Sequence, residues 1–535
     1  MSVSPESLLV VDRHTNHRRF GLLLVLFLAL APRLYAIADT EVIQRDGVTF
    51  IRYARAVESH GLSSAAAFDQ HIGYPLLLAG VHRVVFGGSD SVESWEHAGQ
   101  WISLVAGVVA TAGLWALTGL AVNWRVAWVA VGLFAVGRKW SMLGADVMSD
   151  ATMLSFWVWA LVAAVLAARN SRRWALPLAA LAGTLAALAY LVRPEGAGAA
   201  LVACGLFLFQ ALRHRIPWPR TLALLAAVLI PAVAIASLYA TQIGGLTKKK
   251  DLLPLVPSVW IPAAASALPL AQVPGPAANF SPPVALLAQT AEALGPTVTT
   301  FAAFFLVCVA THFALPLHRR KPHLAVPSGA AGVVIALVLL LYVPILLRLH
   351  VRAGYLDWRH CMTVAFVLVP LAGCALVALI DVLAHATSPV RLKSLSVRQF
   401  VVIQWCWVYP VLIAAAGYQS FRPLHAGNSY VLEAAALLDR DTTPNPRLVT
   451  NLAWLTHYSH MPSQILDSSR IDPATYAVRL AAIAPPPTHI ALSARWFPPG
   501  TDIPALIPPG YIGLHHLHQP GDTPDTLQIF RRTPQ

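Results

Sequence analysis

Long apolar stretches alternate with short polar segments along most of the chain, from Phe20 to Tyr418. Most of these stretches are long enough to cross about 30 Å of hydrocarbon as a helix. Hydropathy and loop charge therefore predict an all-α polytopic membrane protein with about eleven transmembrane helices. The predicted spans are 20–38, 99–122, 125–141, 151–168, 174–192, 197–212, 221–241, 298–317, 325–346, 360–384 and 399–418.

The charge of the connecting segments predicts their side of the membrane. Every second loop is basic, and basic loops stay on the cytoplasmic side, so the N-terminus is predicted inside and the C-terminus outside. The first span also resembles a signal peptide with small residues at Ala36–Ala38. We favour an uncleaved helix, and both interpretations place Asp39 onward on the outer side. The basic segments contain Arg13, Arg18, Arg19, Arg125, Arg169, Arg172, Arg173, Arg213, Arg215, Arg220, Arg319, Arg320, Lys321, Arg391, Lys393 and Arg398.

The pattern changes near Phe421, where long apolar stretches stop and charges, prolines and histidines become frequent. We divide the chain into a transmembrane core, residues 1–420, and a small extracytoplasmic α/β domain, residues 421–535. Short strand-like and helix-like runs support this division. The predicted elements are a helix at Ser429–Leu438 and strands at Arg447–Leu455, His489–Ala494 and Thr526–Phe530.

Composition agrees with a membrane protein. The 535 residues are 57% hydrophobic and only 12% charged, whereas a soluble domain carries about a quarter charged residues. The net charge of +13 is concentrated in the short loops that set topology, so it does not predict nucleic-acid binding. All five cysteines lie in or beside apolar stretches without metal-type spacing, which indicates small core residues.

The polar stretch Asp39–Pro75 is the first outer loop and carries several of the few acids of the chain. Apolar residues after Asp46 recur every three positions, which predicts an amphipathic helix lying in the membrane surface. A carboxylate at its start would meet a lipid-linked donor and a water-soluble acceptor, and could remove a proton from the acceptor. The alternative is a helix N-cap. Asp39 and Glu41 are weaker candidates for the same role.

Two further outer segments carry acids at span ends. Asp146 and Asp150 are four residues apart, so on a helix they would share one face. Such a pair predicts a divalent-metal or acceptor site, with ordinary interfacial residues or a helix cap as the alternative. Arg193 and Glu195 flank a proline at the end of another span, where a role in the site and a local ion pair are both open.

Basic residues on the outer side break the topology rule and suggest anion binding. Arginine binds phosphate oxygens through two N–H groups, and the phosphate of a lipid carrier would lie at this depth. Interfacial snorkelling is the alternative. Three histidines near the C-terminus lack acidic or cysteine partners in sequence, so we interpret them as solvated. The phosphate-binding candidates are Lys248, Arg352, Arg359 and His360; the three histidines are His515, His516 and His518.

The ordered series of outer motifs resembles the C-superfamily of integral membrane glycosyltransferases, over about residues 20–420. Protein O-mannosyltransferases and bacterial aminoarabinose transferases are the most similar groups. The motifs are an acid in the first outer loop, then HIGYPLLLAGVHRVVFG, SDATMLSF, YLVRPEG and GYLDWRHCMTVAFVLVPLAG. Many relatives carry an Asp-Glu pair in the first loop, whereas Asp46 is followed by Gly47 here.

The resemblance implies an inverting transfer of sugar from a polyprenyl-phosphate donor on the outer face of the cell membrane. By motif position it makes Asp46 the base and Asp150 the second acidic residue. Arg193 and Glu195 match the third motif, and Arg359 and His360 match the late motif near the lipid phosphate. Some relatives use a divalent metal ion and others do not, so the cofactor stays open.

Two other classes of function compete with this hypothesis. A secondary transporter or lipid flippase would carry ionisable residues at mid-membrane and matched halves, and neither is evident in the sequence. A non-catalytic envelope-binding relative would leave the ordered outer acids unexplained. The sugar, the acceptor (protein, lipid or glycan), the oligomeric state and the role of residues 421–535 are not predicted.

Overall fold

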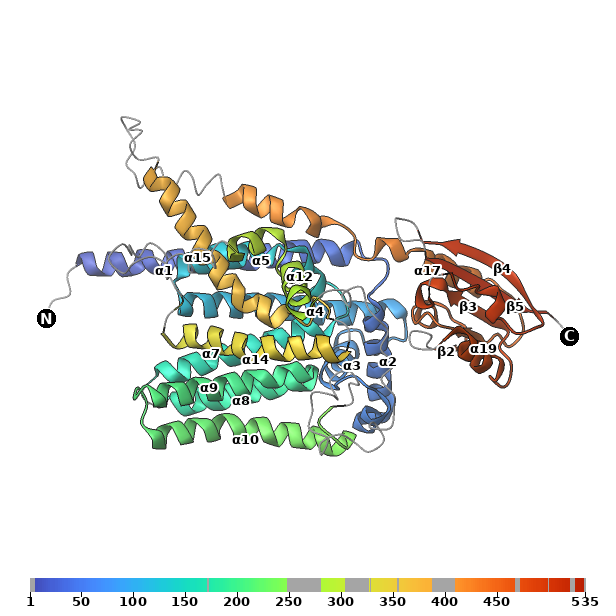
Figure 1. Cartoon of the computed structure of the whole chain (residues 1–535), viewed down its shortest axis with the longest axis horizontal. Helices are drawn as coiled ribbons and strands as arrows, with labels where there is room; N and C mark the ends of the chain where they lie inside the picture. The colour runs from blue at the N-terminus through green and yellow to red at the C-terminus, as the bar shows by residue number, and fades with distance from the viewer. Residues whose placement is uncertain are drawn as a thin grey trace.

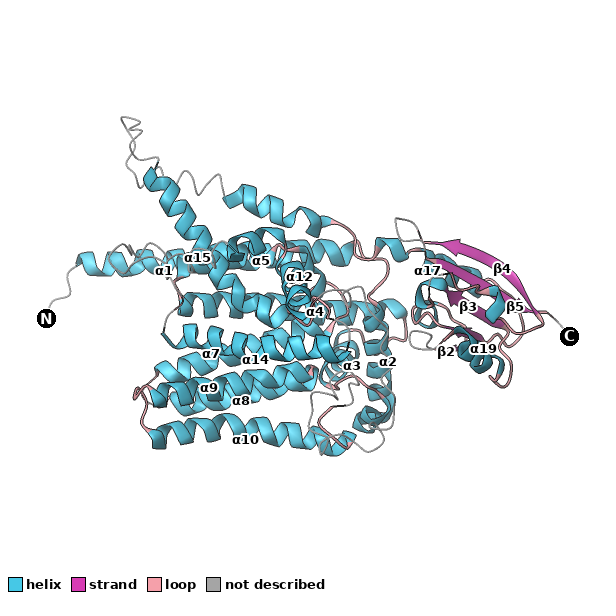
Figure 2. Ribbon diagram, in the orientation of Figure 1, coloured by secondary structure: helices cyan, strands magenta, loops and turns pink. Residues whose placement is uncertain are grey.

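The computed structural model describes residues 5–170, 173–247, 281–303, 327, 329–353, 356–386, 409–466, 472–498, 500–519 and 525–533. A bundle of long helices occupies most of the molecule, and a small β-sheet lies beyond one end of the bundle (Figures 1 and 2). Within the described residues, eight helices are long and apolar enough to cross a membrane.

These eight helices match eight of the predicted spans. The predicted spans 298–317 and 399–418 lie partly outside the described residues. One of the eight, Pro194–Leu212, combines the 3-10 helix η2 (Pro194–Ala197) with α9 (Gly198–Leu212). The other seven lie within α1 (Pro5–Ala38), α4 (Val92–Ala121), α7 (Ser149–Arg169), α8 (Ala175–Val192), α10 (Trp218–Ile243), α14 (Gly329–Ala353) and α15 (Met362–Ala386).

The predicted span 125–141 is not one helix. The chain forms α5 (Trp124–Ala135) and the short α6 (Arg138–Leu143), separated by an extended Gly137. The break frees backbone carbonyls, and Arg33 of α1 donates hydrogen bonds to two of them, Ala135 O (3.2 Å) and Trp140 O (3.1 Å). Arg33 is fully buried. A buried guanidinium in a membrane helix is tolerated when it binds otherwise unsatisfied carbonyls in this way.

Helix α7 lies at the centre of the bundle and packs against α4, α8 and α9. Small residues let the neighbouring helices approach closely, which is how membrane helices gain packing energy. A Cβ atom at Gly183 of α8 would lie only 2.1 Å from the Val228 carbonyl oxygen of α10. The buried alanines on α8 are Ala175, Ala179, Ala182, Ala186, Ala187 and Ala189.

The polar stretch after α1 folds into α2 (Arg45–His60), the 3-10 helix η1 (Gly61–Ala67) and α3 (Gly73–Val85). Helix α2 runs across the end of the bundle on the side of the sheet (Figure 1). The predicted amphipathic helix is confirmed, since Val48, Ile51, Ala54 and Val57 are buried. Its buried face packs on α3 and α4.

The sheet has the strand order β2-β1-β3-β5-β4. Strand β1 pairs in parallel with β2 and β3, while β5 is antiparallel to β3 and β4. We call residues 430–532 the sheet region. It contains α17 (Tyr430–Asp439), β1 (Leu448–Thr450), α18 (Leu455–Tyr458), β2 (Ser463–Ile465), α19 (Pro473–Ala481), β3 (His489–Ser493), β4 (Tyr511–His518) and β5 (Thr526–Arg532).

The predicted helix and three predicted strands of this region correspond to α17, β1, β3 and β5. The predicted first strand is too long, because Leu455 already belongs to α18. Strands β2 and β4 were not predicted. Both are edge strands with mainly exposed side chains, so they lack the apolar alternation that marks a strand with one buried face. His515, His516 and His518 are exposed on β4.

Candidate active site

Charged side chains from distant parts of the chain meet at the end of the bundle that carries α2. The Arg359 Nη1 group donates a hydrogen bond of 2.7 Å to Asp46 Oδ2. Arg359 lies in the turn between α14 and α15, and the Asp357 carboxylate accepts from its backbone N–H (2.8 Å). The structure therefore joins the predicted base to one of the predicted phosphate-binding residues.

Asp46 is not a helix cap in this structure. Helix α2 begins at Arg45, and its N-cap Gln44 makes no side-chain capping bond. The Asp46 side chain is 44% exposed, so the carboxylate is open to an incoming group. Partial burial raises its pKa, but the positive charges of Arg359, Arg193 and Arg45 outweigh burial and hold the pKa below its ordinary value.

Gly47, the residue after Asp46, lies in a tight contact at the start of α2. A Cβ atom at this position would lie 2.9 Å from Val147 Cβ and 3.0 Å from the Val147 carbonyl oxygen. The first turn of α2 therefore packs directly on the segment before α7, and a larger residue after Asp46 would push the two apart.

Arg193 bridges two other acids. Its Nη1 group donates to Asp150 Oδ1 (2.7 Å), and its Nη2 group donates to Glu195 Oε1 (3.0 Å). Asp150 is almost fully buried in the first turn of α7. Its Oδ2 atom has no hydrogen-bond partner among the described residues. The Tyr342 hydroxyl fixes the segment by donating to the Glu195 carbonyl oxygen (2.7 Å).

Asp146 lies in a turn before α7, so it does not share a helical face with Asp150 as the spacing predicted. Its carboxylate accepts from the backbone N–H groups of Gln44 (3.0 Å) and Val147 (2.7 Å). His425 Nε2 also lies 2.7 Å from Asp146 Oδ2. Asp146 therefore contacts the loop that leads into α2, while Asp150 contacts Arg193.

The remaining predicted site residues are only partly covered by the described residues. Helix α14 continues to Ala353, seven residues beyond the predicted span, so Arg352 lies on a helix and not in a loop. The side chain of Arg352 and all of Lys248 lie outside the described residues. His360 follows Arg359 in the same turn and is partly buried.

The acids at this site do not form a metal-type group. No cluster of three or more His, Cys, Asp or Glu side chains occurs among the residues that the structure describes. One oxygen of Asp150 and both oxygens of Glu195 bond to Arg193. The guanidinium supplies the positive charge between the two carboxylates, so the described residues do not fit a divalent ion bridging them.

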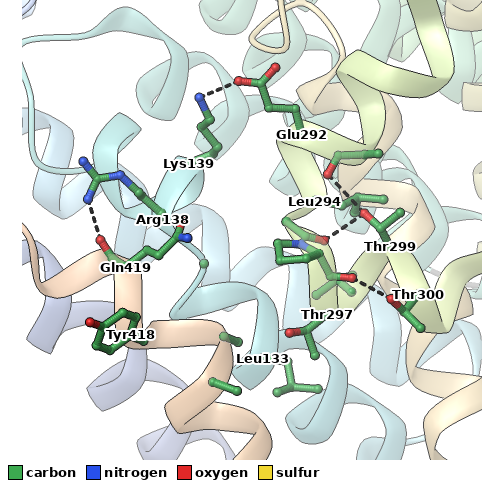
Figure 3. Close-up of a pocket in the computed structure, with 17 residues that line it drawn as sticks. Leu133, Arg138, Lys139, Glu292, Leu294, Thr297, Thr299, Thr300, Tyr418 and Gln419 are labelled. Atoms are coloured by element: carbon green, nitrogen blue, oxygen red, sulfur yellow. Dashed lines mark hydrogen bonds and ion pairs between the residues drawn. The ribbon is translucent and has the colours of Figure 1, made fainter. Parts of the chain in front are cut away.

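A pocket lies beside α6 (Figure 3). It has a volume of about 580 Å³ and is lined by the ends of α5 and α12 (Pro282–Leu294), by α6, and by residues near Tyr418. Lys139 at its rim pairs with Glu292 (2.6 Å), and its Nζ lies 4.6 Å from the centre of the Trp358 ring. The pocket is mostly apolar with basic residues at one side, and Trp358 directly precedes Arg359.

Sequence reasoning missed the contribution of the sheet region and of His425, which precedes it. Trp454 and Tyr458 contact the loop before α2, and His425 contacts Asp146. These residues are separated from their partners by 279 to 415 positions, and nothing in their local sequence distinguishes them from ordinary core residues.

Comparison with known proteins agrees with this architecture. Residues 87–236 match the dolichyl-phosphate-mannose-protein mannosyltransferase family. ArnT from Cupriavidus metallidurans bound to undecaprenyl phosphate aligns over 98% of both chains, with a TM-score of 0.55 and 14% identity. The oligosaccharyltransferase AglB from Archaeoglobus fulgidus aligns over 90% of this chain and 70% of its own, with a TM-score of 0.55 and 14% identity. No curated protein sequence matches the chain.

The bundle, the helices across its end and the terminal sheet thus share the fold of ArnT and AglB. The comparisons confirm the predicted resemblance to C-superfamily integral membrane glycosyltransferases, since the chain is similar to the protein mannosyltransferases over residues 87–236 and to the ArnT fold along its full length.

Proposed function

We propose that this protein transfers a sugar from a polyprenyl-phosphate donor to an acceptor oxygen, with inversion, at the end of the bundle that carries α2. We place this end, and residues 421–535, on the extracytoplasmic side of the cell membrane. The observation that carries the proposal is the Arg359–Asp46 pair, which sets a phosphate-binding cation directly beside an accessible carboxylate. The ArnT structure with undecaprenyl phosphate supports a lipid-phosphate donor.

The reaction is a single displacement. The acceptor O–H gives its proton to Asp46 as the oxygen bonds to the anomeric carbon. The bond from that carbon to the phosphate oxygen breaks, and polyprenyl phosphate leaves with the electron pair. Arg359 stabilises the negative charge that develops on the phosphate. Attack from the face opposite the leaving group inverts the anomeric configuration.

The ion pair of the free protein has a role in this scheme. Arg359 is the main charge that lowers the pKa of Asp46. A donor phosphate competes with the carboxylate for the same guanidinium. When Arg359 bonds to the phosphate, Asp46 becomes more basic, so donor binding prepares the base for the acceptor.

The pocket beside Trp358 supports an apolar donor. Its apolar lining suits isoprenoid units, and Lys139 and Arg138 lie at its basic side (Figure 3). A polyprenyl chain in this pocket would carry its phosphate toward the adjacent Arg359.

The direct test is transfer by purified protein from labelled polyprenyl-phosphate sugars to a panel of protein, lipid and glycan acceptors. We expect label to move to at least one acceptor class and free polyprenyl phosphate to appear in equal amount. Translocation of the labelled lipid across vesicles without transfer would contradict the proposal and favour a flippase.

Chelation of divalent ions is expected to change the initial rate of transfer by no more than about twofold. Arg193 already neutralises Asp150 and Glu195, and a guanidinium needs no metal to hold two carboxylates. The measurement is the initial rate with EDTA and after readdition of Mg²⁺ or Mn²⁺. Loss with EDTA and recovery with either ion would contradict this prediction and show that transfer needs a divalent ion.

Replacing Arg359 by Gln is expected to lower kcat/KM by about 10²–10³-fold, because one donor to the leaving phosphate is lost. It should also change the pH dependence. Below the pKa of Asp46 the base is protonated and transfer stops, and Arg359 keeps that pKa low. Without Arg359 the pKa rises, so the acidic fall in kcat/KM should move to higher pH.

The control for this variant is Arg52→Gln, which removes an exposed guanidinium from α2. It should leave both the rate and the pH profile near wild type. An unshifted acidic limb in Arg359→Gln would show that Asp46 is not the titrating base.

A further inference from the structure

We infer that Trp454 and Tyr458 of the sheet region are positioning residues that fix the backbone leading into α2 and thereby place Asp46. The inference rests on the proposed function for its catalytic consequence, but its structural part can be tested without activity. It assigns to the C-terminal part of the chain a direct role in building the active site.

Both peptide groups of Ile43 are bonded to the sheet region. Trp454 Nε1 donates to the Ile43 carbonyl oxygen (2.7 Å), and the Ile43 N–H donates to the Tyr458 hydroxyl (3.1 Å). Ile43 is fully buried and Trp454 is 4% exposed. The Trp454 bond is therefore buried and the Tyr458 bond partly buried, so losing the Trp454 donor leaves a buried carbonyl oxygen unsatisfied.

The contacts continue along the next two residues. The Gln44 N–H donates to Asp146, which also pairs with His425. The Arg45 guanidinium lies 4.1 Å from the centre of the Trp496 ring. We call the contacts of residues 43–45 the clamp. Three successive residues before Asp46 are thus held by side chains from other parts of the chain.

The clamp fixes the start of α2, which lacks a capping side chain. A helix start is normally fixed by a capping side chain, and none is present at Gln44. The position of the first turn, and of Asp46 within it, then depends on the partners of residues 43–45. Among the described residues, the direct side-chain partner of Asp46 is Arg359, which the donor phosphate would take away.

One edge of the sheet positions these partners beside α2. Trp454 and Trp496 follow the carboxyl ends of the parallel strands β1 and β3, so this edge of the sheet faces α2. Asn451, just after β1, bonds to both the N–H and the carbonyl oxygen of Ser493 at 2.9 Å. The carboxyl edge of parallel strands is where α/β domains commonly place functional groups.

The test uses Tyr458→Phe, which removes only the hydroxyl, and Trp454→Phe, which removes the indole N–H together with part of the buried ring system. We expect each to lower kcat roughly tenfold, since a small displacement of a catalytic group is costly, with KM for the donor within about twofold. The double variant should lose little more than either single one, because both bonds hold the same residue.

A direct structural readout is amide hydrogen exchange in the peptide that spans residues 39–47. Exchange at Ile43 is expected to rise about fivefold to tenfold in Tyr458→Phe, which removes the acceptor of that N–H. The matched control is Tyr511→Phe, which removes a hydroxyl bonded to the Pro487 carbonyl oxygen (2.6 Å) within the same sheet region. It should change neither exchange nor kcat.

Exchange in residues 39–47 equal to wild type for both clamp variants would overturn the inference. Equal loss of kcat in Tyr511→Phe would also overturn it, because the effect would then be general destabilisation of the sheet region. If exchange is faster in the clamp variants but the wild-type protein transfers no sugar, the clamp is confirmed and the proposed function is contradicted.

Discussion

Replacing Asp46 by Asn is expected to reduce kcat by about 10²–10⁴-fold, the usual contribution of a general base. Asparagine has nearly the same shape and can still accept a hydrogen bond from Arg359, so the fold and donor binding should persist. It cannot take a proton at the pH of the assay. The measurement is initial-rate transfer under donor and acceptor saturation, with thermal unfolding recorded in parallel.

The matched control is Asp39→Asn, the same chemical change at an exposed acid of the same loop. It should transfer sugar at close to the wild-type rate. Normal turnover by Asp46→Asn would remove Asp46 as base, and a loss in Asp39→Asn or Asp150→Asn would then show which acid replaces it.

Replacing Arg193 by Met is expected to destabilise the protein by about 3–5 kcal/mol, the cost of leaving a buried charge without its partner. Asp150 is 2% exposed, and within the part of the chain that the structure describes its side-chain partner is Arg193. The free energy of unfolding in detergent, or the midpoint of thermal unfolding, measures the effect.

A second substitution separates charge from packing. In Arg193→Met with Asp150→Asn, the buried carboxylate is gone, so much of the lost stability should return. Arg215→Met, which removes an exposed arginine from the loop after α9, should stay within about 0.5 kcal/mol of wild type. If Arg193→Met behaved like Arg215→Met, the Arg193–Asp150 pair would not be important for stability.

The helical bundle could be predicted because membrane spans are marked by hydropathy alone. Eight predicted spans match helices, and Asp46 and Asp150, which loop charge predicted on one side of the membrane, lie at the same end of the bundle. The break at Gly137 was missed because Arg138 and Lys139 are only two charged residues at the end of the apolar run Val126–Val136, too few to divide the predicted span. The carbonyls that Arg33 binds there give no sequence signal.

The sequence indicated individual site residues but not the contacts between them. Motif order indicated that Asp46 and Arg359 matter, but not that they bond to each other across 313 positions. The spacing of Asp146 and Asp150 predicted a common helical face, but Asp146 lies in a turn before the helix, so the two carboxylates contact different partners. Contacts of this kind depend on tertiary packing, which a helical or strand period does not encode. The clamp is the extreme case, since its partners come from a region with no recognisable motif.

The clamp also sets when the site can exist during biosynthesis. Ile43 is made early, and Trp454 is added 411 residues later. At about 5–20 residues per second, the ribosome needs roughly 20–80 s to synthesise the intervening chain. The first loop therefore emerges without its partners, and Asp46 reaches its final place only after nearly all of the polypeptide has been inserted. A nascent chain stalled before the sheet region would be membrane-embedded but inactive.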